Sequence, residues 1–154
     1  MDSKQAQKPG GNGVDLGMLK SLLGYHLRRA QVAVFQHFTT VMGEVEITPG
    51  QFGVLTVING NPGLSQTQLG NALGIDRSTV VAVIDRLEGR GLVLRTPSPT
   101  DRRSHALRLS ADGERLLKRL EDMVRAHERE ISRDLSAEDQ RLLLRLLDRV
   151  ARPE

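Results

Sequence analysis

Cysteine and tryptophan are absent from this sequence, and the only aromatic side chains among its 154 residues are three Phe and one Tyr. The absence of cysteine excludes disulfide bonds, thiolate metal sites and a cysteine-based redox sensor in this chain. No stretch approaches the roughly 20 apolar residues of a membrane-spanning helix, and the first residues lack the apolar segment of a signal peptide. We therefore expect a cytoplasmic protein that does not use a membrane.

Signatures of enzymes and of metal sites are also missing. The sequence has no glycine-rich phosphate loop, no nucleophile elbow and no pair of carboxylates of a catalytic kind. No two of its histidines show the i,i+4 spacing of metal ligands on a helix; they are His26, His37, His105 and His127. We expect no catalytic residue, no metal and no cofactor.

The formal net charge of +3 is concentrated in one segment. Residues 76–108 contain seven arginines and four acidic residues, whereas residues 47–75 carry no charge. A local basic patch is typical of a protein that binds a polyanion, and guanidinium groups suit forked contacts to phosphate or guanine. Chance clustering of the arginines is the alternative.

The same basic segment opens with an amphipathic helical pattern. Asp76 is well placed to cap the helix, and Gly89 and Gly91 predict its end. The apolar stripe consists of Val80, Val83, Ile84 and Leu87, and the opposite face carries Arg77, Ser78, Val81, Asp85 and Arg86. Short polar, small apolar and basic side chains on one face suit the major groove of DNA. An ordinary amphipathic helix with a solvated basic face is the alternative.

The neighbouring segments predict a winged helix-turn-helix. Before the basic helix, residues 64–73 predict a short helix that opens at Ser65 and ends at Gly74. After it, residues 92–96 and 105–109 alternate as two strands, and the turn-rich tip between them carries Arg102 and Arg103. The tip of such a hairpin can lie along the phosphate backbone or in the minor groove. An ordinary surface hairpin is the alternative.

The rest of the chain predicts helices that form a dimer. Residues 15–43, the segment from Ser110 to about residue 133, and residues 136–150 all carry apolar stripes at helical spacing, and a further helix begins at Thr48 and Pro49. His26 and His37 lie on the first stripe, where we expect buried histidines with satisfied hydrogen bonds. We expect a flexible arm at 1–14, a helical dimerisation region at 15–46 and 111–154, and a DNA-binding domain at 47–110. Packing within one chain is the alternative to dimerisation.

Two motifs carry a family resemblance. The sequences DRSTVVAVIDRLEGRGLVLR at 76–95 and DRRSHALRLSADG at 101–113 resemble the multiple-antibiotic-resistance regulator (MarR) family of winged-helix transcription factors. The likeness covers about residues 15–150. It implies a mainly α-helical fold with a small β-hairpin wing, assembled as an obligate homodimer through its first and last helices.

The resemblance also implies a set of DNA-binding residues. Asp101 matches the position that, in this family, holds the wing arginines in place by ion pairing. At the position where many relatives carry a polar and then a long basic residue, this chain has Val81 and Ala82. We therefore expect base reading to rest more on apolar contact and on Arg77 than it does in those relatives. The residues implied to bind DNA are Ser65, Gln66, Arg77, Ser78, Thr79, Val81, Arg86, Arg102 and Arg103.

The function that we expect is a dimeric repressor of a pseudopalindromic operator in double-stranded DNA, released by a small effector. Proteins similar to this one respond to phenolic compounds, aromatic acids or coenzyme A thioesters. From apolar surface and nearby polar groups, we expect the effector to contact Tyr25, His26, Arg29, Phe38 and Phe52. A ligand-independent DNA-binding regulator or activator is the first alternative, and a helical protein-interaction module is the second.

Overall fold

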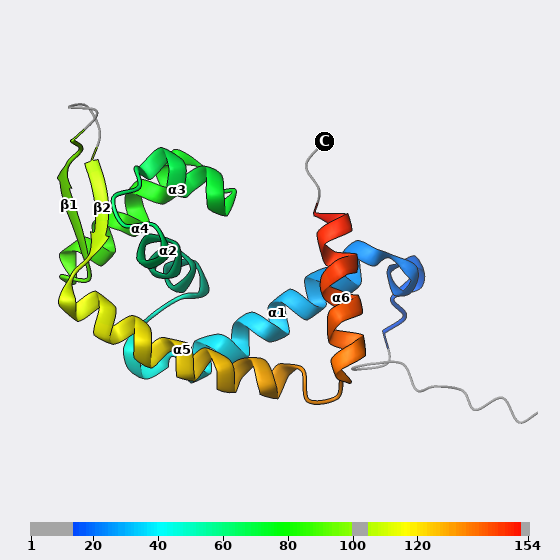
Figure 1. Ribbon diagram of the computed structural model, residues 1–154. Coiled ribbons are helices and arrows are strands. Elements are labelled where there is room, and N and C mark those ends of the chain that lie inside the picture. Colours follow the sequence, from blue (N-terminus) through cyan, green and yellow to red (C-terminus); the bar gives the residue numbers. More distant parts are fainter. Residues whose placement is uncertain (1–13, 100–104, 152–154) are drawn as a thin grey trace, which may run out of the picture. The chain divides into compact units, whose positions relative to one another are not determined.

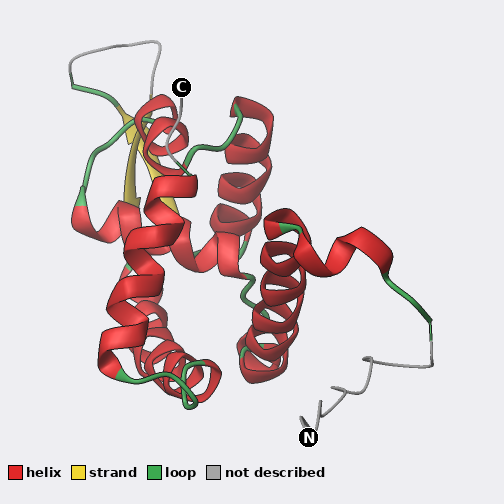
Figure 2. Cartoon of the chain, turned by 90° about the vertical axis from the view of Figure 1, so that its right-hand side faces the viewer, coloured by secondary structure: helices red, strands yellow, loops and turns green. Residues whose placement is uncertain are grey.

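The computed structural model describes residues 14–99 and 105–151 (Figure 1). Helices account for most of these residues, and a two-stranded hairpin is the only sheet within the described ranges (Figure 2). The expected fold class, mainly α with a β-hairpin, is therefore confirmed. The α-helices are α1 (Leu23–Val41), α2 (Pro49–Gly60), α3 (Gln66–Leu73), α4 (Arg77–Gly89), α5 (Ala111–Ile131) and α6 (Ala137–Val150), and the strands are β1 (Val93–Pro97) and β2 (His105–Leu109). None of the helices in these ranges combines the length and apolar character needed to cross a membrane.

The chain divides into two compact units, with the boundary between Val34 and Phe35, inside α1. In the first unit, the single helix expected over residues 15–43 is interrupted. A 3-10 helix at Gly17–Ser21 ends at Leu22, whose backbone is extended (φ −89°, ψ 124°). At the start of this 3-10 helix, the Asp15 carboxylate accepts hydrogen bonds from the Gly17 amide at 3.1 Å and from the Lys20 ammonium at 3.0 Å. A short acidic side chain that bonds the nearby backbone competes with a regular helix.

The helix starts in the second unit are those that the sequence predicts. At the start of α2, α3, α4, α5 and α6, a side-chain oxygen accepts a hydrogen bond from the backbone N–H three residues further on. Pro49 occupies the first turn of α2, where its missing N–H leaves no intrahelical bond unmade. These caps fix where each helix begins; the capping residues are Thr48, Ser65, Asp76, Ser110 and Ser136.

Helix α2 is central to the core of the second unit. It packs against α3, α4, α5 and β2. The apolar face of α4 also turns inward: Val80, Ile84 and Leu87 are buried, and Val83 is half-buried. The opposite face of α4 is consequently exposed. The core residues with 0% exposure are Leu55, Ile58, Leu69, Ile84, Leu87, Val93, Leu107 and Leu120.

Strands β1 and β2 are antiparallel, and Arg95 lies opposite Leu107 in the register. β2 has the predicted bounds, and β1 begins one residue later than predicted. The turn before α3 adds a short third pairing: the Gly63 amide donates to the Leu107 carbonyl at 2.7 Å, and the Leu107 amide donates to the Leu64 carbonyl at 2.9 Å. The segment before α3 is thereby hydrogen-bonded to the hairpin that follows α4.

Two glycines hold the hairpin between α4 and α5. Gly91 has φ +70°, which reverses the chain after α4, as predicted. Gly113, in the first turn of α5, lies so close to the hairpin that an added Cβ would be 2.1 Å from the carbonyl oxygen of Leu92. The Ser110 hydroxyl also donates to the Gly91 carbonyl at 2.5 Å. The start of α5 is therefore packed directly on the base of the wing.

Candidate nucleic-acid interface

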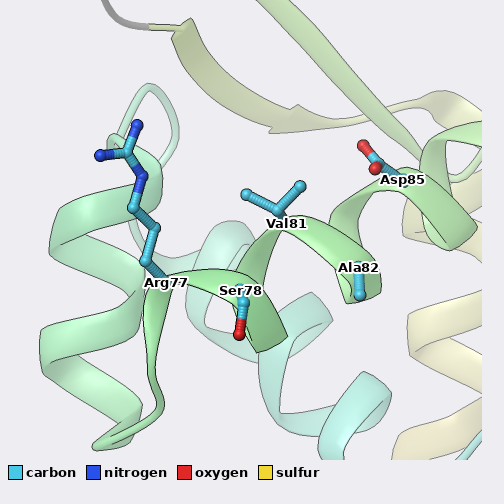
Figure 3. Close-up of a pocket in the computed structure, with 5 residues that line it drawn as sticks. All are labelled: Arg77, Ser78, Val81, Ala82 and Asp85. Atoms are coloured by element: carbon cyan, nitrogen blue, oxygen red, sulfur yellow. The ribbon is translucent and has the colours of Figure 1, made fainter.

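The exposed face of α4 forms a concave surface on the second unit (Figure 3). The spacing of its residues places them on one side of the helix, opposite the buried stripe. The structure thus brings together most of the polar and basic face that the sequence predicts. The surface is lined by Arg77, Ser78, Val81, Ala82 and Asp85.

Asp76 organises the first turn of this helix. Its carboxylate accepts from the Ser78 hydroxyl, from the Thr79 amide at 3.0 Å and from the Thr79 hydroxyl at 2.7 Å. The hydrogen bond from Ser78, followed by those from Thr79, holds the pKa of Asp76 well below its usual range. Both hydroxyl protons are directed at the cap. What Ser78 and Thr79 offer outward is therefore a hydrogen-bond acceptor, which suits an amino group on a base edge better than a phosphate.

The turn that leads into α4 is tight. Gly74 ends α3 with φ +63°, and the Ile75 amide donates to the Gly70 carbonyl at 3.0 Å. A Cβ on Gly70 would lie 3.0 Å from the carbonyl oxygen of Ile75 and 3.1 Å from Cγ2 of Val80. The glycine lets α3 and α4 approach closely, which produces the helix-turn-helix expected from the sequence.

Of the expected contacts on α3, Ser65 caps the helix and Gln66 is its first residue. Both are half-buried. The Ser65 hydroxyl accepts from the Gln68 amide at 3.2 Å, and the Gln68 side chain accepts from the Ser65 amide at 2.9 Å. Arg86 is exposed on α4. The wing-tip residues Asp101, Arg102 and Arg103 lie outside the described residues.

Sequence reasoning missed the role of Arg95. This β1 side chain donates to Glu88 and to Asp85, both at 2.5 Å. The acidic residues Asp85 and Glu88, spaced i,i+3 on α4, were the available signal. Their partner could not be identified from spacing alone, because Arg95 reaches the pair from another element.

The expected effector-binding residues fall into two groups. In the first unit, the rings of Tyr25 and His26 meet edge-on at 5.6 Å, and the Arg29 guanidinium lies 5.7 Å from the Tyr25 ring centre. In the second unit, the rings of Phe38 and Phe52 are 6.4 Å apart. The expected burial of His26 is wrong. In the single chain its side chain is exposed. Its hydrogen bond is satisfied, because Nε2 lies 2.8 Å from the Lys20 carbonyl oxygen.

A pair of histidines was also missed. Nδ1 of His37 lies 2.6 Å from Nδ1 of His127, and the Phe38 ring meets His127 edge-on at 5.4 Å. Burial lowers the pKa of His127, and the charge on His37 lowers it further. His37 is half-buried, so its expected burial is met in part. The described residues contain no cluster of three or more His, Asp or Glu side chains arranged to hold a metal ion.

Comparisons with known proteins agree on one family. Residues 46–104 match a sequence model described as MarR family. A relative from Thauera aromatica, named as a transcriptional regulatory protein for the hcr operon, is 41% identical over 139 residues, which cover 90% of this chain and 84% of the relative.

Solved structures of similar proteins cover almost the whole chain. The transcriptional repressor CouR bound to a 23-mer DNA duplex has a TM-score of 0.87 and 43% identity, and the match covers 92% of this chain and 100% of that chain. CouR bound to p-coumaroyl-CoA has a TM-score of 0.85 and 40% identity, with 92% and 99% covered. The PcaV regulator from Streptomyces coelicolor in complex with its natural ligand has a TM-score of 0.82 and 34% identity, with 92% and 97% covered.

Proposed function

Because this chain belongs to the MarR family of winged-helix transcription regulators, we propose that it is a repressor that binds an operator in double-stranded DNA as a homodimer. The observation that carries the proposal is the exposed face of α4, which is the second helix of a helix-turn-helix and is followed by a hairpin. This face carries basic, short polar and small apolar side chains together with Asp85. A face of this composition fits a major groove. The likeness to CouR bound to a DNA duplex supports the same reading.

The proposed roles of the DNA-binding residues follow from their chemistry. Arg77 and Arg86 supply positive charge to phosphate or guanine, and Val81 offers an apolar contact to a thymine methyl group. Ser78 and Thr79 accept from base amino groups, because their protons are engaged by Asp76. At the N-terminus of α3, Ser65 and Gln66 lie where backbone N–H groups favour a phosphate. At the wing tip, we propose that Arg102 and Arg103 contact DNA and that Asp101 holds them.

The dimer is proposed to form through residues 15–46 and 111–154. In the single chain, the apolar stripe of α6 remains exposed, with exposed fractions between 36% and 52%. Burial of this apolar surface in a symmetric interface favours association. A two-fold pair of α4 helices would then match a pseudopalindromic operator whose half-sites lie about one helical turn apart. The stripe consists of Leu142, Leu143, Leu146, Leu147 and Val150.

The effector is proposed to be a small aromatic acid or its coenzyme A thioester. CouR, which has been solved with p-coumaroyl-CoA, supports this class. PcaV, which has been solved with its natural ligand, supports regulation by a ligand. We propose that Arg29 binds an effector carboxylate and that the aromatic group contacts Tyr25, His26, Phe38 and Phe52. Release of DNA requires that the effector bind better to a dimer whose α4 helices do not fit the operator.

A selection experiment tests this function. Purified protein is used to enrich 30-base-pair duplexes from a random library, and complexes with the enriched duplex are then titrated with p-coumaroyl-CoA, benzoyl-CoA and free aromatic acids. We expect inverted repeats bound by two protomers, and release of the duplex by one compound class. Enrichment of no sequence would contradict operator binding, and a stable complex with every compound would contradict the effector class.

A further inference from the structure

Arg95 on β1 joins three elements of the winged helix. Its Nη1 donates to Glu88 Oε2 at 2.5 Å, and its Nη2 donates to Asp85 Oδ1 at 2.5 Å. The side-chain amide of Gln66 is oriented so that its oxygen faces Arg95. This oxygen accepts from Nε of Arg95 at 3.2 Å and from Nη2 at 3.0 Å. One guanidinium therefore bonds the first residue of α3 and two successive turns of α4.

The contacts of Arg95 leave it poorly placed to bind phosphate itself. All three of its nitrogen atoms have a partner within the chain, and its side chain is only 18% exposed. Asp85 and Glu88 are more open, at 58% and 40%. A forked guanidinium that holds two carboxylates loses little conformational freedom for each further hydrogen bond.

Asp85 gives the arrangement its relevance to DNA. This carboxylate lines the concave surface together with Arg77 and Val81 (Figure 3). A carboxylate on a DNA-facing surface repels phosphate and is tolerated best when a positive group offsets it. Arg95 supplies that group and at the same time fixes the direction of the carboxylate. Gln66, which is itself expected to contact DNA, is fixed by the same guanidinium.

We propose that Arg95 is a positioning residue for operator recognition. It holds α3, α4 and the first wing strand in one register and offsets the charge of Asp85 and Glu88, and it makes no contact with DNA. This inference rests on the proposed DNA-binding function. Arg95 then contributes to DNA affinity through the side chains that it holds, and not through a contact of its own with phosphate.

A double-mutant cycle separates positioning from direct contact. The variants are Arg95→Gln, Asp85→Asn with Glu88→Gln, and all three together. Dissociation constants are measured by fluorescence anisotropy on the enriched duplex and on a scrambled duplex of equal length, over a series of salt concentrations. Arg133→Gln is the matched control, because it removes an exposed arginine that pairs with Glu130, three residues earlier in the chain. Thermal unfolding shows whether each variant is folded.

We expect Arg95→Gln to weaken binding to the enriched duplex by about tenfold, and to weaken binding to the scrambled duplex much less. In the background that lacks both carboxylates, the same substitution should cost less than twofold and leave the salt dependence unchanged. A merely structural role would lower the unfolding temperature without changing the ratio between the two duplexes.

Equal losses in both backgrounds, with a salt slope lowered by about one per protomer, would show direct phosphate contact and overturn the inference. Unchanged affinity in Arg95→Gln would overturn it as well. If Arg95→Gln does not fold, Arg95→Lys replaces it: a positioning role predicts a clear loss because lysine lacks the fork, whereas near-normal affinity overturns the inference. Failure of the unaltered protein to bind any duplex would instead contradict the proposed function.

Discussion

Nδ1 of His37 lies 2.6 Å from Nδ1 of His127, across 90 positions of the sequence. At this distance one imidazole donates and the other accepts, so a single proton lies between the two Nδ1 atoms. Doubly protonated rings would set two donors against each other. Burial, and then the charge of His37, lowers the pKa of His127, and Glu128 opposes these effects.

This pair predicts a loss of stability in mild acid. A histidine whose pKa is lowered in the folded state binds fewer protons there than in the unfolded chain. Its contribution is fully present above the unfolded pKa of about 6.5 and is lost as the pH falls through the lower folded value. Unfolding temperatures from pH 8 to pH 5 should therefore fall more steeply for the unaltered protein than for His127→Gln. Parallel curves would contradict the prediction.

Gly113→Ala should destabilise the protein by about 1–3 kcal/mol. The new Cβ would lie 2.1 Å from the carbonyl oxygen of Leu92, so α5 and the base of the wing must move apart. Chemical denaturation measures the change in the free energy of unfolding. Gly89→Ala is the control, because nothing lies within 4 Å of a Cβ at that helical position. Equal effects of the two substitutions would show that the close approach at Gly113 is unimportant.

Leu147→Glu should disrupt the proposed dimer. A charge placed in the apolar stripe of α6 must be buried without a partner if the stripe forms an interface. Sedimentation velocity at several protein concentrations should show a dimer for the unaltered chain and a smaller species for the variant. Arg141→Glu on the same helix also adds a negative charge but lies off the stripe, and should remain dimeric. Dimers in both variants would place the interface elsewhere.

Arg29→Ala should abolish the effect of the effector while leaving DNA affinity nearly unchanged. Arg29 stacks on the Tyr25 ring in the first unit, where it can offer its charge to a carboxylate. Arg28→Ala, an exposed neighbour on the same helix, is the control and should still release DNA when the effector is added. Loss of DNA binding in Arg29→Ala would indicate a role in folding instead.

The local features of the fold could be predicted from the sequence, because they depend on neighbouring residues. The caps at Thr48, Ser65 and Asp76 follow from short polar side chains before apolar runs, and the two faces of α4 follow from helical periodicity. The interruption at Leu22 was not predicted. The extended backbone of Leu22 lies within a continuous apolar pattern, which does not reveal it.

Contacts between distant segments limited how much of the candidate site could be predicted from the sequence. The exposed row on α4 was predicted, whereas the bonds from Arg95 to Gln66 and Asp85 depend on how β1 packs. The pairing of His37 with His127 depends in the same way on how α1 and α5 meet in the second unit. Which side chains contact DNA and effector stays a prediction, since it depends on molecules that bind the chain.

The most direct test of the central claim is a salt titration of DNA binding by the unaltered protein and by Arg77→Ala. We expect the unaltered protein to bind the enriched duplex far more tightly than a scrambled one, with an affinity that falls steeply as the salt concentration rises. We also expect Arg77→Ala to weaken binding to the enriched duplex by about tenfold or more, because a charged contact of α4 is lost in both protomers. Equal affinity for the two duplexes, with no effect of Arg77→Ala, would contradict the central claim.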